Sequence, residues 1–222
     1  MTEDRKLLVG VDLSNDFTQL SCYRRDIDKV IPAGRLVGRE REYECPTVLS
    51  WQPVKKEWLF GTEALMAAER EEVYLFRDML KQISEKNKVT AGDMELEPVD
   101  ALVRFFVKLL SCLKEYFPSE TIRKLVISVS DKTDNLVNAL KGALNRIGIG
   151  EERYVIQLHQ QSYMYYALSQ KKELWLNDVA LFEFGRDGLF YSQIHIDRRN
   201  IPYIVGVKKI DLSQNLNWDM ME

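Results

Sequence analysis

The sequence predicts an α/β fold in which a mixed β-sheet is covered by helices. Three observations indicate this fold. Strand-like apolar runs fill the first sixty residues, an amphipathic helical pattern begins near residue 98, and short apolar strands then alternate with helices to about residue 170. The opening hairpins favour antiparallel pairing, whereas strands separated by helices favour parallel pairing. A mixed sheet is therefore expected.

The first sixty residues are predicted to be mostly β-strand. Leu7–Leu13 is an apolar run that ends in Ser14-Asn15-Asp16, and Phe17–Tyr23 then alternates like a strand with one buried face. This order predicts a hairpin whose turn carries polar side chains. Further strands are predicted at residues 29–37, 46–51 and 57–61.

Helices are predicted to dominate the next part of the chain. Thr62 is expected to cap a helix over residues 63–70, residues 73–83 fit no single pattern, and residues 84–97 are expected to be a polar link containing Gly92. Pro98 suits the first turn of a long helix that ends before Pro118. One face of that helix is apolar: Leu102, Phe105, Phe106, Leu109, Leu110 and Leu113.

The remaining elements alternate between strand and helix. Asp131 or Thr133 is expected to cap a helix that ends at Ile147, where Gly148 and Gly150 follow. A further helix is predicted at 160–170, and the predicted strands are at 125–129, 154–158, 179–184, 189–196 and 203–207.

Composition and charge exclude several classes of protein. The 222 residues are 45% hydrophobic and carry a net charge of −3, without the clustered Lys and Arg that nucleic acids or anionic membranes attract. No apolar run is long enough to span a membrane. Cys22, Cys45 and Cys112 are widely spaced, which suits neither a disulfide framework nor a zinc site. We expect a cytoplasmic protein that binds neither nucleic acid nor membrane.

The two ends of the chain share a short pattern. Residues 9–16 and 180–187 each place an acidic side chain, Asp12 or Glu183, near the end of an apolar strand. A tight polar turn and a second strand follow in both cases. The sequence therefore predicts a weak internal repeat.

These residues resemble the actin-like ATPase superfold of actin, hexokinase and the seventy-kilodalton heat-shock chaperones. Residues 10–18 are similar to the family's first phosphate motif, and Phe182-Glu183-Phe184-Gly185-Arg186-Asp187-Gly188 stands at the place of the second. Residues 46–49, 59–64 and 124–130 match chaperone segments by position. The resemblance covers most of the chain and implies an RNase H-like lobe followed by the first strands of a second, similar lobe.

The resemblance also implies the site residues. Asp12 and Glu183 correspond to carboxylates that hold Mg²⁺, and the phosphates of ATP or ADP would meet Ser14, Asn15, Asp16, Glu183, Gly185 and Arg186. Gln160 stands where the chaperones have their catalytic glutamate, and Lys81 matches their catalytic lysine. Several of these residues depart from the family pattern. Asp16 adds negative charge beside phosphate, Arg186 replaces a small residue, although it is able to pair with phosphate itself, and Gln160 cannot act as a base.

The resemblance divides the chain into two parts. Residues 1–175 would be the first lobe, with a β-rich insertion around 38–97, and residues 176–222 would begin an incomplete second lobe. Three strands without covering helices expose an apolar face. We expect that face to be covered by a missing second lobe or by a partner protein; a homo-oligomer is a separate possibility for the chain.

Three hypotheses for function follow from the resemblance. The first is a divergent, prokaryotic chaperone-like protein whose ATPase activity is weakened or lost and which binds other proteins as a scaffold. The second is an active ATP-hydrolysing or phosphotransfer enzyme. The third is a structural protein that polymerises as bacterial actins do. The degenerate motifs favour a protein that is not an enzyme.

Overall fold

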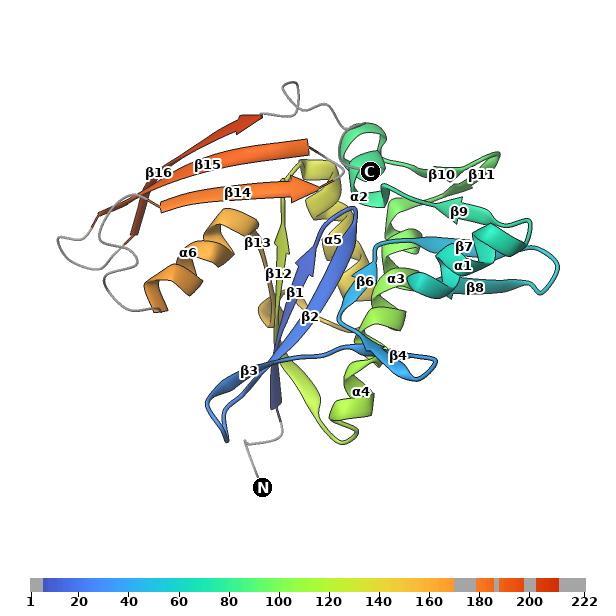
Figure 1. Cartoon of the computed structure of the whole chain (residues 1–222), viewed down its shortest axis with the longest axis horizontal. Helices are drawn as coiled ribbons and strands as arrows, with labels where there is room; N and C mark the ends of the chain where they lie inside the picture. The colour runs from blue at the N-terminus through green and yellow to red at the C-terminus, as the bar shows by residue number, and fades with distance from the viewer. Residues whose placement is uncertain (1–5, 170–178, 186–187, 198–202, 212–222) are drawn as a thin grey trace. The chain divides into compact units, whose positions relative to one another are not determined.

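The chain folds as an α/β protein made of two compact units. The computed structural model describes residues 6–169, 179–185, 188–197 and 203–211 (Figure 1). Unit 1 comprises Met1–Gln157 and unit 2 comprises Leu158–Glu222. The helix after Leu158 packs with the strands of unit 2. The division into lobes after residue 175, which the resemblance implied, stays a prediction.

The central sheet of unit 1 is mixed, as predicted. Its strand order is β13-β12-β1-β2-β3, and β6 also pairs with β2. β1 is parallel to β12 and antiparallel to β2. The strands are β1 (Lys6–Leu13), β2 (Phe17–Arg24), β3 (Lys29–Pro32), β6 (Glu44–Pro46), β12 (Thr121–Val129) and β13 (Tyr154–Leu158).

One face of this sheet forms the main core. Alternate residues of β1, from Leu7 to Leu13, are at most 4% exposed. Helices α3 (Pro98–Ser111) and α5 (Asp134–Arg146) bury their apolar faces in the same cluster, including Phe105, Phe106 and Leu140 (Figure 1). The periodicity that predicted α3 therefore reflects burial of that helix against the sheet.

The ends of α5 follow the sequence signals. Thr133 is the N-cap, and its hydroxyl oxygen accepts a hydrogen bond from the Leu136 amide at 3.3 Å. Gly148 follows with a φ of +83°, a conformation that favours glycine. Short elements continue the chain: α4 (Leu113–Tyr116) lies before β12, and the 3-10 helix η2 (Glu151–Arg153) lies before β13.

The strand predicted at 29–37 is divided in two. β3 ends at Pro32 and β4 (Arg35–Val37) pairs with β5 (Glu40–Glu42) as a separate hairpin. Gly34 lies at the break, where its amide and carbonyl both bond the Tyr116 hydroxyl, at 3.0 and 2.9 Å. This tertiary contact takes the place of strand pairing at Gly34.

The rest of the insertion is more regular than the sequence predicted. The polar link at 84–97 contains a β-hairpin, β10 (Val89–Ala91) with β11 (Met94–Leu96), whose turn includes Gly92 at a φ of +59°. Residues 73–83 contain both a strand and the start of a helix. The other elements are β7 (Leu49–Gln52), β8 (Glu57–Phe60), α1 (Thr62–Arg70), β9 (Tyr74–Phe76) and α2 (Met79–Lys86).

Unit 2 is a three-stranded antiparallel sheet with one helix. The strand order is β14-β15-β16. Helix α6 packs on one face of the sheet, where Met164 meets Val179 and Ile194. The elements are α6 (His159–Ser169), β14 (Val179–Gly185), β15 (Gly188–Asp197) and β16 (Tyr203–Asp211).

Candidate functional site

The expected site residues fall into two groups, one in each unit. Asp12, Ser14, Asn15, Asp16 and Lys81 belong to unit 1, whereas Gln160, Glu183 and Gly185 belong to unit 2. Arg186 lies outside the described residues. Asp12 and Glu183, the expected Mg²⁺ ligands, therefore lie in different units, and their pairing on one ion stays a prediction.

Asp12 lies at the carboxyl end of β1, beside the parallel strand β12. Its register partner is Ser128, and the Ser128 hydroxyl donates a hydrogen bond to Asp12 Oδ1 at 3.0 Å. The Asp12 residue is exposed at this edge of the sheet. The carboxyl edge is where open α/β sheets usually bind ligands, so Asp12 has the location that its predicted role requires.

The turn after β1 is held by hydrogen bonds between its own first and last residues, Ser14 and Phe17. The Ser14 hydroxyl donates to the Phe17 carbonyl at 2.8 Å and accepts from the Phe17 amide at 3.2 Å. The Ser14 amide also donates to the Phe17 carbonyl, at 3.3 Å. Two backbone amides of this turn are therefore already paired within the chain.

Asn15 caps a helix that is remote in the sequence. Only 6% of Asn15 is exposed, and its Oδ1 accepts hydrogen bonds from the amides of Leu80 at 3.0 Å and Lys81 at 3.2 Å. These amides belong to the first turn of α2. Asp78, the residue at the N-cap position of α2, makes no capping bond with its own side chain. Asn15 therefore satisfies the helix end that Asp78 leaves open.

Lys81 is brought next to the turn by this cap. Its backbone amide contacts Asn15, and the Lys81 residue itself is exposed on the first turn of α2. The backbone of Lys81 thus lies beside the first phosphate motif. The catalytic role of Lys81 stays a prediction.

Residues of the insertion hold the other side of the turn. The Thr47 amide donates to the Asp16 carbonyl at 3.0 Å, and the buried hydroxyls of Thr18 and Thr47 are 2.8 Å apart. The turn is thus fixed both by α2 and by the segment after β6.

Two of the backbone amides of the turn are already engaged, and nucleotide binding by the turn stays a prediction. A phosphate cradle needs backbone amides that point at the anion, and the amides of Ser14 and Phe17 are engaged elsewhere. The Asn15 oxygen faces α2, and Asp16 adds a negative charge that repels phosphate oxygens. We therefore derive no chemical step through a bound nucleotide.

Replacing Asn15 tests the cap. Asn15→Ala is expected to lower the free energy of unfolding by about 1–2 kcal/mol, because the amides of Leu80 and Lys81 lose their acceptor. Urea unfolding measures this loss. Asn145→Ala, which removes an exposed Asn from α5, is the control and should change the free energy by less than about 0.5 kcal/mol. Equal stability of the two variants would contradict a capping role.

In unit 2, Glu183 is held by the first turn of α6. Glu183 Oε1 lies 3.0 Å from His159 Nδ1, and Gln160 Nε2 donates to Glu183 Oε2 at 2.8 Å. The side chains of His159 and Glu183 are only 18% and 15% exposed. Gln160 and Glu183, matched separately to the resemblance, are therefore direct neighbours.

Gln160 is also tied to the sheet behind Glu183. It is 3% exposed, and its Nε2 lies 3.4 Å from the hydroxyl of the fully buried Ser192. His159, the first residue of α6, bonds the carboxylate of Glu183, 24 residues away in the sequence. Glu183, His159, Gln160 and Ser192 form a buried polar network in which the carboxylate accepts from two side chains. Gly185, at the end of β14, pairs with Gly188 across the hairpin.

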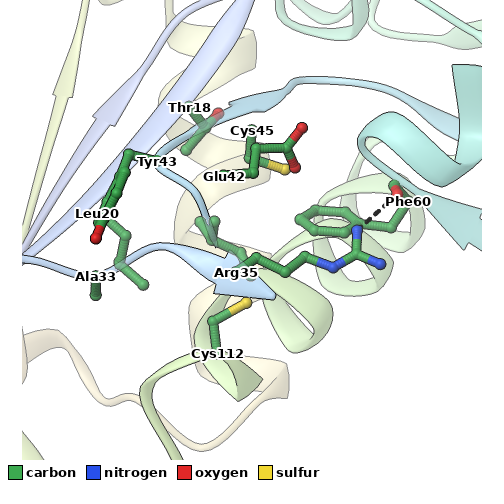
Figure 2. A pocket seen from close by; sticks show the side chains of 10 residues that line it. Thr18, Leu20, Ala33, Arg35, Glu42, Tyr43, Cys45, Phe60 and Cys112 are labelled. Carbon is green, nitrogen blue, oxygen red and sulfur yellow. Dashed lines mark hydrogen bonds between the residues drawn. The ribbon is translucent and has the colours of Figure 1, made fainter. Parts of the chain in front are cut away.

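Figure 2 shows a small cavity between β2, β4 and α3, lined by side chains that include Arg35, Glu42, Cys45 and Cys112. Its volume is about 10 Å³, room for about one water molecule. Arg35 donates to the Phe60 carbonyl at 2.9 Å and pairs with Glu63. The cavity is too small for a nucleotide or a metabolite.

Burial controls the chemistry of all three cysteines. Burial raises the pKa of Cys22 to about 11 from 9.0, and it also raises the pKa of Cys45 and of Cys112. Reactive cysteines have lowered pKa values and partial exposure. These three are therefore structural thiols.

The raised pKa of Cys22 predicts a loss of stability in alkali. The unfolded chain releases the Cys22 proton above pH 9, whereas the folded chain keeps it until about pH 11. The stabilising contribution is thus complete below pH 9 and is lost as the pH rises from 9 to 11. The urea concentration at the midpoint of unfolding should fall as the pH is raised from 8.5 to 10.5. It should fall less in Cys22→Ala. An equal fall in both proteins would contradict the prediction.

A larger apolar groove lies at the opposite end of β1. It has a volume of about 500 Å³ and is lined by parts of α3, α4 and the start of β12, together with Leu7. Five residues of strand separate Leu7 from Asp12, a distance of about 17 Å. The groove is therefore separate from the first phosphate motif.

Two kinds of feature are not found in the described part of the chain. Its His, Cys, Asp and Glu residues form no group of three that is able to hold a metal ion. Within the same ranges, no helix combines the length and the apolar character needed to cross a membrane.

Comparison with known proteins identifies one family. No match was found among curated proteins. Residues 35–222 match the family described as "Family of unknown function (DUF5716) C-terminal". Because this match spans more than half of the 222 residues, the chain belongs to that family.

Proposed function

We propose that the chain is a divergent, chaperone-like member of the actin-like ATPase superfold that acts as a protein-interaction scaffold without ATP turnover. The fold supports this proposal at its coarser level. A β1-β2-β3 antiparallel meander is joined to β12, which runs parallel to β1, β13 lies beside β12 in the strand order, and helices cover one face. This arrangement agrees with an RNase H-like lobe. A fold alone does not establish a function, so the contacts of the two phosphate motifs are needed as further support.

The main support for the proposal is the turn at Ser14–Phe17, where hydrogen bonds join Ser14 and Phe17 to each other. In an ATPase of this superfold, the first turn would offer its amides to phosphate. Here the amides of Ser14 and Phe17 are paired within the turn, and the Asn15 side chain is bonded to α2. These two amides would gain little from a phosphate, because each new hydrogen bond would replace an existing one.

The second motif supports the same proposal. The carboxylate of Glu183 accepts from His159 and Gln160, and neither side chain is exposed by more than a fifth. The Glu183 carboxylate and the Gln160 amide are already bonded to each other in a mostly buried place. The network is better suited to joining α6 to its sheet than to turning over a substrate.

An assay of ATP hydrolysis tests the proposal. The full chain with Mg²⁺ and ATP is expected to release phosphate at the rate of a no-protein control, and Asp12→Ala is expected to behave identically. Turnover that exceeds the control and disappears in Asp12→Ala would instead support the second hypothesis, an ATP-hydrolysing enzyme. Glu183→Gln serves as a further control in unit 2, since contaminating ATPase activity would survive both substitutions.

A further inference from the structure

Two polar side chains are buried without partners on one face of β7. Ser50 is 0% exposed and Gln52 is 1% exposed. Within the described residues, the Ser50 hydroxyl and both polar atoms of the Gln52 amide have no hydrogen-bond partner. Successive side chains of a strand point to opposite faces, and Leu49 and Trp51 contact the main core. Ser50 and Gln52 therefore lie on the face of β7 that points away from that core.

Helix α1 covers this face. It contacts β7 and both neighbours of β7 in the sheet, β8 and β9. Its buried residue, Ala64, is fully enclosed but lies outside the main core cluster, as expected for a helix on the far side of these strands. An alanine side chain neither donates nor accepts a hydrogen bond. The cover therefore leaves the groups of Ser50 and Gln52 unsatisfied, which is a cost to the closed arrangement.

Little apolar burial holds α1 in place. Ala64 is the one buried residue of this helix, whereas the shorter α2 buries Met79, Leu80 and Ile83. No side chain caps the first turn of α1, whereas Asn15 caps α2. Few buried apolar contacts are a mark of a segment that opens locally. We therefore expect α1 to be the less stable helix of the two.

Polar contacts tie α1 at its two ends. They join Thr62 to Glu42 and Glu63 to Arg35 in the first turn, and Glu71 to Lys55 just after the last turn. The carboxylates of the two ion pairs are 51% and 44% exposed. Exposed ion pairs contribute little to stability and weaken as salt screens them. The contacts at the ends of α1 are thus easily released.

We propose that α1 is a displaceable cover, which lifts from β7 as a local unit while β7, β8 and β9 stay in place. In the open form Ser50 and Gln52 form hydrogen bonds with water, which offsets the loss of the contacts at the ends of α1. The strands stay attached because their other face keeps its packing on the core, where the ring centroids of Trp58 and Phe76 are 5.7 Å apart. The proposed scaffold role does not require this motion, so the two proposals are tested separately.

Native-state hydrogen exchange of the full chain tests the inference. In the wild type, the amides of residues 66–70 in α1 are expected to exchange about tenfold or more faster than those of residues 83–86 in α2. Exchange of α1 should respond weakly to low urea concentrations, because lifting one helix exposes little surface. Equal exchange of the two helices would overturn the inference. Exchange of β7 in step with α1 would also overturn it, since the strands would then open together with the helix.

The double variant Ser50→Ala, Gln52→Met removes the unpartnered groups with little change in side-chain size. Exchange of α1 is expected to slow about tenfold or more, because closing no longer buries unsatisfied polar atoms. Gln19→Met, which changes an exposed glutamine of β2, is the matched control and should leave α1 unchanged. Unchanged or faster exchange of α1 in the double variant would overturn the inference, because it would mean that bound water satisfies both side chains in the closed form. Circular dichroism checks folding, and Gln52→Met alone replaces the double variant if that protein does not fold.

Discussion

Gly61→Ala is expected to lower the free energy of unfolding by about 2–5 kcal/mol. Gly61 precedes α1 at φ 59° and ψ −138°, a conformation that costs other residues about 1–3 kcal/mol. A β-carbon at this position would also meet Cys45 Sγ at 2.7 Å, a distance that forces the buried thiol or the turn to move. Overpacking of this kind adds about 1–3 kcal/mol.

Gly38→Ala separates these two effects. Gly38 has a φ of +62°, but a β-carbon there meets nothing within 4 Å. Its substitution should therefore show the conformational cost without the clash. Both variants are compared by urea unfolding. If Gly61→Ala were no less stable than Gly38→Ala, the packing of Gly61 against Cys45 would be wrong.

Glu183→Ala is expected to destabilise unit 2 by about 2–4 kcal/mol. The substitution removes the acceptor of both His159 and Gln160, and leaves polar groups in a site that is mostly closed to water. The effect should be concentrated in unit 2, since these contacts all lie within it. Hydrogen exchange measures it locally, as faster exchange of the β14 and β15 amides.

Glu183→Gln is the matched control for this prediction. Its amide keeps the shape of the side chain and one oxygen that accepts a hydrogen bond. A loss smaller than that of Glu183→Ala is therefore expected. Unchanged exchange in Glu183→Ala would show that the network contributes nothing to the packing of α6.

Long periodic elements were predictable from the sequence. The β1–β2 hairpin, the helix beginning at Pro98 and the cap at Thr133 each depend on neighbouring residues, and the structure confirms them. The alternation of strands and helices also predicted the mixed sheet. Local signals were sufficient here because burial follows the same period as the sequence pattern.

Elements that depend on distant contacts were not predictable. Thr62 was expected to cap α1, but it is the first helical residue and its hydroxyl bonds Glu42 of β5. The three-residue strands β10 and β11 are too short to show alternation, although the glycine in the turn between them was a signal. Trp51 and Trp58 pack against the core, with their ring centroids 5.2 Å apart.

The candidate site shows the same division. Its residues were recognised by their order along the chain, but their actual contacts join positions far apart. Asn15 and Leu80 are separated by 65 residues, and Glu183 and His159 by 24. No spacing rule connects such positions in a single sequence. The polar residue after β1 indicated a role, and only the fold shows that this role includes capping α2.

Calorimetric titration with nucleotide is the most direct test of the central claim, that the first phosphate motif is closed. The full chain is titrated with ATP and with ADP in the presence of Mg²⁺, and Asp12→Ala is titrated in parallel. We expect no heat beyond dilution for either protein. Micromolar binding that is lost in Asp12→Ala would contradict the account, because it would mean that the turn at Ser14–Phe17 opens to receive phosphate.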